Sequence, residues 1–117
     1  MFASVLYIQL TLENGQRVIR DRALLRAVRG SFFIDSVQAD IIKILLRQSE
    51  DTKLSDDKFA IFIFKKEEEI DLPKRFLVEI GDVILDIEKI KPFEFYVKDI
   101  LRGGFIKAGN EVKIVKF

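Results

Sequence analysis

The side chains of this chain that could perform chemistry are carboxylates, lysines, arginines and tyrosines, because the sequence has no Cys, no His and no Trp. This composition excludes the Ser-His-Asp triad, the Cys-His pair and metal sites ligated by His or Cys. Carboxylates can still act as general acids and bases or bind Mg²⁺. The missing residue types favour a protein that is not an enzyme, and we predict no cofactor.

The densest group of carboxylates lies in a polar segment that we expect to be a loop. Glu50 and Asp51 are followed closely by Asp56 and Asp57. Hard cations need several oxygen ligands that converge on one point. We therefore consider this loop, and Asp56 and Asp57 within it, as a candidate source of metal ligands. The alternative interpretation is a solvated, charged loop.

A cluster of arginines precedes that loop, within thirteen residues that hold one acid, Asp21. Guanidinium groups form bidentate contacts with phosphates, so the cluster is a candidate nucleic-acid surface. The alternative is an ordinary amphipathic helix whose solvent-facing side uses Arg. The candidate nucleic-acid-binding residues are Arg17, Arg20, Arg22, Arg26 and Arg29.

Part of the chain resembles minimal nucleotidyltransferases of the polymerase-β type. Ser49, then the segment 55–61 (Ser-Asp-Asp-Lys-Phe-Ala-Ile), then a helix and the strand with Glu94 follow the order of elements in that family. The resemblance implies divalent-metal and nucleotide binding near Asp56 and Asp57, and it adds Glu94 as a third candidate metal ligand. The chain departs from the family because Gln-Ser replaces Gly-Ser and Asp-x-Lys replaces Asp-x-Asp, so such a domain would be catalytically degenerate.

Residues 91–117 locally resemble the second, β-barrel domain of translational GTPases. Residues 92–99 (Pro-Phe-Glu-Phe-Tyr-Val-Lys-Asp) look like its opening strand, and residues 102–115 look like its later hairpin. The strand pair that lies between those pieces in the family is missing, and no GTPase motif is present. We attribute this resemblance to convergence, because unrelated hairpins use similar residues.

The chain has the size and composition of one globular domain spanning residues 1–117. It has 49% hydrophobic and 33% charged residues, with a net charge of +1. Abundant Lys, Arg and Glu with few thermolabile residues is typical of thermophile proteins. The N-terminus does not resemble a signal peptide, and no apolar run approaches 18 residues, so we expect a cytoplasmic protein that does not enter a membrane.

One hairpin and two helices are expected in the first half of the chain, and a third helix or a hairpin is expected later. Residues 5–12 alternate apolar side chains, and Asn14-Gly15 then predicts a hairpin with a type I′ turn. Helical spacing predicts helices at 21–30 and 35–48, separated by a short buried segment. Residues 73–90 fit a third helix slightly better than a hairpin around Gly81-Asp82.

The remaining elements are expected to be strands. Residues 59–64 are apolar on both faces, which predicts a central strand. A strand at 93–97 and a last hairpin around Gly109-Asn110 complete the chain. The predicted fold is α+β: an N-terminal β-hairpin, two helices, and a mixed or antiparallel sheet with a third helix or hairpin.

Missing catalytic residue types and an excess of apolar strand faces together favour a non-enzymatic interaction or assembly module. We expect its partner to be a protein or a second copy of the chain. The alternatives are nucleic-acid binding through the arginine cluster and a degenerate nucleotidyltransferase.

Overall fold

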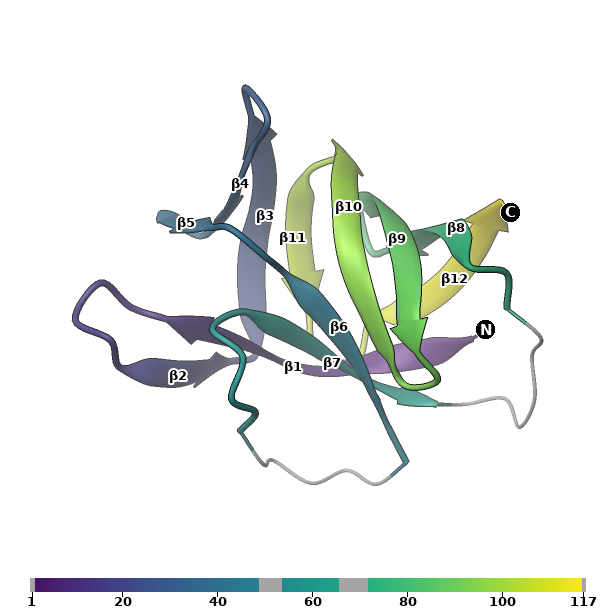
Figure 1. Ribbon diagram of the computed structural model, residues 1–117, viewed down its shortest axis with the longest axis horizontal. Coiled ribbons are helices and arrows are strands. Elements are labelled where there is room, and N and C mark those ends of the chain that lie inside the picture. Colours follow the sequence, from purple (N-terminus) through teal and green to yellow (C-terminus); the bar gives the residue numbers. More distant parts are fainter. Residues whose placement is uncertain (1, 49–53, 66–71, 117) are drawn as a thin grey trace.

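All the regular structure in the described part of this chain is β, so the predicted α+β fold is wrong (Figure 1). The computed structural model describes residues 2–48, 54–65 and 72–116. These ranges contain twelve strands and no helix. It follows that no described segment is an apolar helix long enough to cross a membrane.

The strands fall into two sheets. The larger contains β1 (Ala3–Thr11), β2 (Arg17–Arg20), β6 (Lys43–Arg47), β7 (Ala60–Lys65), β8 (Arg75–Ile80), β9 (Val83–Lys91), β10 (Glu94–Arg102) and β12 (Glu111–Lys116). The smaller contains β3 (Arg22–Val28), β4 (Ser31–Ile34), β5 (Val37–Ala39) and β11 (Gly104–Lys107).

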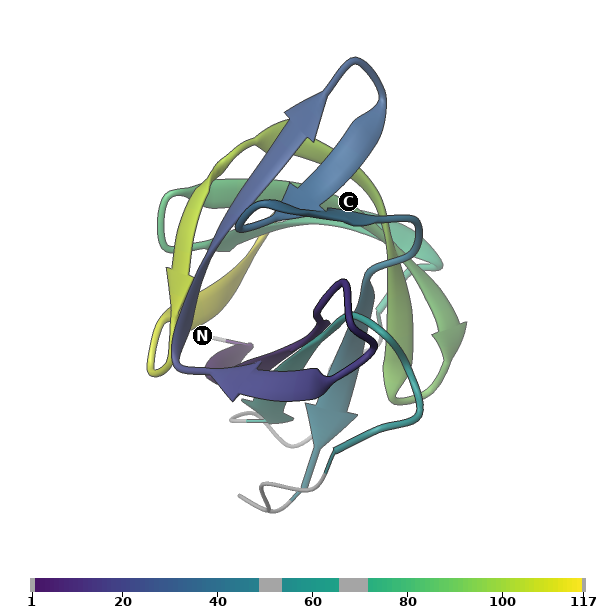
Figure 2. The ribbon, with the colours of Figure 1, turned by 90° about the vertical axis from the view of Figure 1, so that its left-hand side faces the viewer.

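Seven strands of the larger sheet close into a barrel, which Figure 2 shows nearly end-on. The order is β12-β8-β9-β10-β6-β7-β1, and β1 closes the ring by pairing Ala3 with Val112 and Ser4 with Glu111 of β12. Neighbouring strands are antiparallel except β6 and β7, which run parallel. Beyond the closure, the far half of β1 pairs with β2, which lies at the edge of the sheet. Closure satisfies backbone groups that an open sheet would leave at its edges.

The barrel interior is the hydrophobic core, because alternate residues of every strand point inward. Phe76 of β8 meets Phe95 of β10 edge-on, with ring centroids 5.9 Å apart. Other large side chains with less than 2% exposure include Ile8, Ile44, Ile61, Ile63 and Ile80. Burial of this set supplies the main driving force for folding.

A β-bulge between Val5 and Tyr7 alters the alternation expected for the first strand. Val5 and Ile8 both lie in the interior core, whereas Leu6 and Tyr7 lie in a second cluster on the outside of the barrel. An extra residue in one strand shifts all later side chains to the opposite face. Val5 therefore faces the core beside Ile8 rather than sharing the face of Tyr7.

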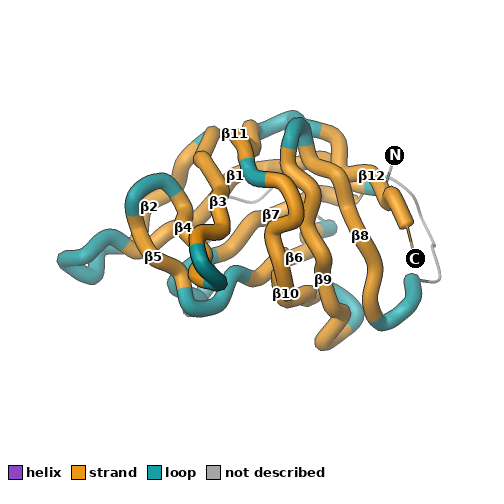
Figure 3. Tube along the Cα trace, turned by 90° about the horizontal axis from the view of Figure 1, so that it is seen from above, coloured by secondary structure: helices purple, strands orange, loops and turns teal. Residues whose placement is uncertain are grey.

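The smaller sheet adds its inward face to the same core. Ala23 and Leu25 of β3, Ile34 of β4 and Ile106 of β11 are at most 1% exposed and join the interior cluster. The β3–β4 hairpin projects beyond the ring of barrel strands (Figures 1 and 2), and the same sheet is seen at one end of the molecule from above (Figure 3). Its other face points away from this core.

The helix predicted over 21–30 is wrong, because these residues form β3 and a tight turn. Leu24, Leu25 and Val28 fit a helical stripe, but Ala23 and Leu25 alternate equally well with Arg22 and Arg26. β3 is paired on both edges, by β4 and β11, and those hydrogen bonds favour the strand. The helix predicted over 35–48 is wrong for the same reason, since it contains β5 and β6.

Turn chemistry also differs from the expectation. The first hairpin is confirmed, but Gly15 alone has positive φ (85°), and its N–H donates to the Leu12 carbonyl at 2.9 Å. The predicted type I′ turn therefore is not formed there. Positive φ at two successive turn residues occurs instead at Arg29 (51°) and Gly30 (82°), between β3 and β4. This is the backbone pattern of a type I′ turn.

The predictions for the later part of the chain are also right in some places and wrong in others. Residues 75–91 form the β8–β9 hairpin around Gly81-Asp82, so the preferred helix is wrong and the hairpin alternative is right. Residues 59–64 are confirmed as a strand buried on both faces. The turn at Gly109-Asn110 exists, but its two strands do not pair with each other. β11 joins β3, and β12 joins β8 and β1.

Candidate nucleic-acid interface

The outward face of the β11-β3-β4-β5 sheet combines aromatic and basic side chains. Cross-strand pairing places Phe105 opposite Leu24 and Phe33 opposite Arg26. Side chains two residues apart share a face of a strand. We call this surface the basic-aromatic face, and its members on the four strands are Arg22, Leu24, Arg26, Val28, Ser31, Phe33, Gln38, Phe105 and Lys107.

Two arginine-phenylalanine pairs dominate this face. The Arg22 guanidinium carbon lies 4.5 Å from the Phe105 ring centroid, and that of Arg26 lies 5.6 Å from the Phe33 centroid. Both distances are within the range of cation–π contacts. Phe105 retains 42% exposure, which is high for a phenylalanine that nothing in the fold requires at the surface.

The face is positively charged although the chain as a whole is nearly neutral. Arg22, Arg26 and Lys107 are exposed, and no outward position on β3, β4, β5 or β11 carries an acid. Asp35 lies in the adjoining turn, where its carboxylate accepts the Leu24 backbone N–H at 2.9 Å. Local charge of one sign on a concave or flat surface attracts polyanions even when net charge is small.

The structure separates the five candidate arginines into different environments. Arg22 and Arg26 share the basic-aromatic face, and Arg29 lies in the turn at the end of β3. Arg17 lies elsewhere: it donates to the Ser55 carbonyl at 2.7 Å and is 3.9 Å from the Asp56 carboxylate. Arg20 is exposed on β2, opposite Ile8, on the other side of that strand from Arg17.

Comparison of the chain with protein-family models, with curated proteins and with solved structures finds no match. The chemistry of the surface is therefore the basis for assigning a function.

The three candidate metal ligands are placed differently from one another. The ammonium group of Lys43 lies between two of them, 2.9 Å from Asp57 and 3.6 Å from Glu94. Asp56 has a fully exposed side chain and faces Arg17. Within the described ranges, no three acidic side chains form a group that could hold a metal ion. Glu50 and Asp51 lie outside the described residues.

Lys43 holds the segment before β7 against the outside of the barrel. The hydrogen bond that the Lys43 ammonium donates to Asp57 raises the pKa of Lys43 above its ordinary value, burial opposes this shift, and the charges of Asp57 and Glu94 reinforce it. The cluster continues to Tyr96, whose ring centroid is 5.8 Å from the Lys43 ammonium. Asp57 and Glu94 therefore lie close together because both pair with the ammonium group of Lys43.

Gln9 anchors the same segment from β1. Its side chain has no exposed area; it donates to the carbonyls of Ser55 and Asp57 and accepts the Ser55 N–H at 2.9 Å. Nearby, Tyr7 stacks on Phe62 with centroids 4.5 Å apart. Sequence reasoning treated Gln9 as an ordinary outward residue of an alternating strand.

Among the aromatic and basic members of the face, Phe33, Phe105 and Lys107 were not identified from the sequence. Each lies on a strand other than β3, and Phe105 is 83 positions away from Arg22 in the chain. The available signal was the alternation of Phe105, Ile106 and Lys107, which predicts one inward and two outward side chains. Nothing local indicates that this outward pair lies beside Arg22.

Proposed function

We propose that this protein binds single-stranded nucleic acid on the basic-aromatic face. The observation that carries the proposal is the pair of arginine-phenylalanine stacks, Arg22 with Phe105 and Arg26 with Phe33, on one exposed sheet surface. Aromatic rings and guanidinium planes on a sheet are platforms on which unpaired bases stack. Basic side chains beside them contact the phosphates.

The spacing of the two stacks suits a single strand. Phe105 lies on β11 and Phe33 on β4, so one strand, β3, separates them. Strands lie about 4.8 Å apart, and the two rings are also offset by two residues, about 7 Å, along β3, which places them roughly 12 Å apart. This separation exceeds the rise between stacked neighbouring bases, so an extended strand would place alternate bases on the two platforms.

A duplex fits this surface less well. In a duplex the bases are already stacked and present only their edges, so exposed phenylalanine rings find no π face to contact. The face also has no helix that could enter a major groove. We therefore expect preference for single-stranded over double-stranded ligand of equal length.

The test is fluorescence anisotropy with a labelled eight-nucleotide oligomer at low salt. Arg22→Ala with Arg26→Ala is expected to weaken binding more than tenfold, and Phe105→Ala to weaken it about fivefold or more, because base–aromatic stacking contributes about 1–3 kcal/mol. All three side chains are exposed, so thermal unfolding should change little.

A charge-matched control distinguishes this surface from general electrostatic attraction. Lys91→Ala with Lys113→Ala removes two exposed positive charges from the barrel strands β9 and β12. The affinity of this double variant for the oligomer should stay within about twofold of the affinity of the original protein. Equal losses in both double variants, or no effect of Phe105→Ala, would contradict the proposal.

Assembly of several copies is a second candidate, favoured by the position of β2. This strand pairs with β1 on one side and, among the described residues, with no strand on the other. Unpaired edge strands can hydrogen-bond to an edge of another chain. By contrast, the apolar faces of β7 that first suggested self-association are buried within the chain, since Phe62 has no exposed area.

Sedimentation velocity over a hundredfold range of concentration tests assembly. A sedimentation coefficient that rises with concentration, and that Ile19→Pro in β2 abolishes, would support pairing through this edge, because proline removes a backbone donor. A constant monomer value would exclude it.

A further inference from the structure

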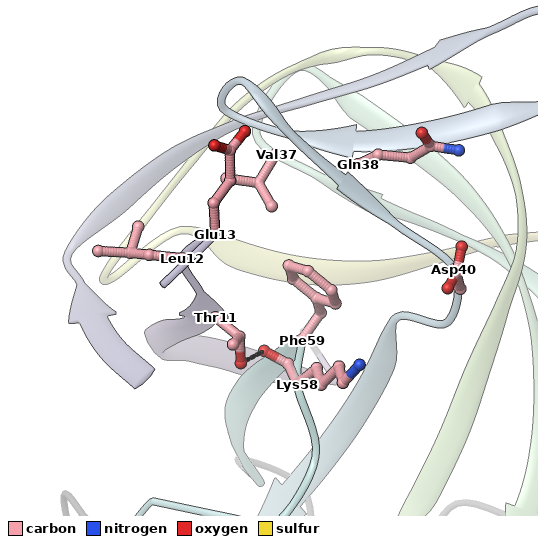
Figure 4. A pocket seen from close by; sticks show the side chains of 8 residues that line it. All are labelled: Thr11, Leu12, Glu13, Val37, Gln38, Asp40, Lys58 and Phe59. Carbon is pink, nitrogen blue, oxygen red and sulfur yellow. Dashed lines mark hydrogen bonds between the residues drawn. The ribbon is translucent and has the colours of Figure 1, made fainter. Parts of the chain in front are cut away.

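A cleft lies where the basic-aromatic face ends, at β5. It has a volume of about 290 Å³ and is formed by the end of β1, by β5 and by the residues that precede β7 (Figure 4). The Phe59 ring rises in its middle and is 6% exposed, so it forms an apolar floor. Pockets for drug-sized ligands occupy about 300–1,000 Å³, so this cleft has room for one small planar group.

The polar groups around that floor are mainly hydrogen-bond acceptors. The exposed carboxylates of Glu13 and Asp40 lie on opposite sides of the Phe59 ring (Figure 4). An ionised carboxylate accepts hydrogen bonds and cannot donate them. Lys58 adds one charged donor, whereas the Thr11 hydroxyl is already used, since it donates to the Lys58 carbonyl at 2.9 Å.

Gln38 connects the cleft to the basic-aromatic face. It lines the cleft, and on β5 it lies directly opposite Phe33. Its amide also reaches Ser31 on β4, at 3.4 Å, across the outward face. Val37, which pairs with the buried Ile34, and Phe59 line the cleft on the inward side of β5. A strand that crosses the sheet from Phe105 over β3 to Phe33 therefore reaches the cleft by passing over β5, the last strand of that sheet.

We infer that the Phe59 cleft receives one base of the bound strand and selects bases that carry an exocyclic amino group. The inference rests on the proposed function, because the basic-aromatic face delivers the strand to the cleft. The apolar floor contacts the edge or plane of the base, and the carboxylate of Glu13 or of Asp40 accepts from the amino group. Glu and Asp recognise cytosine through its N4 amino group in this manner.

Cytosine and uracil make the sharpest comparison, since both are pyrimidines of nearly equal size. Cytosine presents an amino donor at position 4, where uracil presents a carbonyl acceptor. Two acceptors that face each other leave both without a hydrogen bond and repel when one is charged. Stacking on Phe59 is common to both bases, so the ratio of their affinities isolates recognition of the amino group.

The experiment measures binding of eight-nucleotide oligo(dC) and oligo(dU) at pH 7.5 by fluorescence anisotropy. We expect oligo(dC) to bind at least about fivefold more tightly. In the variant Glu13→Ala with Asp40→Ala the ratio should fall to near one, even if removal of negative charge strengthens both affinities. The face variant Arg22→Ala with Arg26→Ala should weaken both oligomers equally and keep the ratio.

The outcomes separate the two proposals. Equal affinities for oligo(dC) and oligo(dU), both lowered by the face variant, would overturn the cleft assignment and leave the proposed function intact. If neither oligomer binds, the proposed function fails, and an NMR titration with free cytidine and uridine then decides on the cleft. Shifts of the Phe59 and Val37 signals with cytidine alone would support it, and equal or absent shifts would overturn it.

Discussion

Gln9 shows how one buried polar side chain can determine the position of a surface segment. It lies on β1, and its side chain bonds to backbone groups of Ser55 and Asp57 and to the Ser55 hydroxyl, which donates to it at 3.4 Å. Those backbone groups are distant from any strand partner. The side chain therefore replaces the missing ladder of hydrogen bonds and keeps the approach to β7 in place.

We predict that Gln9→Leu lowers the free energy of unfolding by about 2–3 kcal/mol, because it leaves several buried backbone groups without partners. Urea denaturation measures this change. Gln38→Leu, the same substitution at an exposed position, should change it by less than about 0.5 kcal/mol. A similar effect of the two substitutions would show that the Gln9 contacts do not hold the segment.

The ion pairs of Lys43 contribute to the free energy of unfolding by an amount that depends on pH. Its folded pKa is raised above 10.5 by Asp57 and Glu94, whereas the unfolded value stays at 10.5. A raised pKa means that the stabilisation is fully present below pH 10.5 and is lost as the pH rises through the folded value.

We predict that Lys43→Met lowers the free energy of unfolding by about 1 kcal/mol at pH 7, a value reduced for partial solvent exposure. The difference from the original protein should stay constant up to about pH 9.5 and shrink above pH 10.5. Urea denaturation at a series of pH values provides the measurement. If the difference in free energy of unfolding between the two proteins grew as the pH rises, this explanation of the Lys43 contribution would be wrong.

At the scale of single elements, the β3–β4 hairpin combines an unfavourable turn residue with a candidate function. Arg29 has φ of 51° in a turn where Asn or Gly is preferred. Left-handed backbone costs a residue of this kind roughly 1 kcal/mol. A strained arginine at the end of a basic face is consistent with selection for charge over stability.

We predict that Arg29→Asn raises the free energy of unfolding by about 0.5–1 kcal/mol and weakens oligonucleotide binding about twofold to threefold. Chemical denaturation and anisotropy measure the two effects. Arg20→Asn is the control, because Arg20 has ordinary backbone geometry and lies off the face. A gain in stability at Arg20 equal to that at Arg29 would contradict the turn explanation.

The elements also show where local patterns were sufficient. The hairpin of β1 and β2 and the doubly buried strand β7 were predictable, because a turn signal or an uninterrupted apolar run identifies them without reference to the rest of the chain. For residues 22–28 the periods 2 and 3.6 fit equally well, since the segment is too short to distinguish them. The strand forms there because β4 and β11 occupy both edges.

On the scale of the whole molecule, a chain with net charge +1 presents one positively charged face. Binding of a polyanion should then depend on salt only through that face. Arg22, Arg26 and Lys107 are the exposed cations on its strands. Each phosphate contact to a single strand contributes about −0.7 to the slope of log K against log salt.

With Arg29 of the adjoining turn as a fourth contact, we predict a slope of about −3 for an eight-nucleotide oligomer between 25 and 200 mM salt, and about −1.4 after Arg22→Ala with Arg26→Ala. Anisotropy titrations at four salt concentrations give both slopes. A slope steeper than about −4 would mean that cations outside the face take part in binding.

The amino-acid composition alone limited the available chemistry, because absent His and Cys remove whole classes of site whatever the fold. The order of residues also marked Arg17, Arg20, Arg22, Arg26 and Arg29 as an unusual group, of which the structure places Arg22 and Arg26 on one face. The fold class and the surface around these arginines depended on pairings between distant segments. β1 with β12 closes the barrel, and β11 with β3 brings Phe105 beside Arg22. Hydrogen bonds of this kind form between backbone groups that every sequence possesses, so no local pattern encodes which strands will meet.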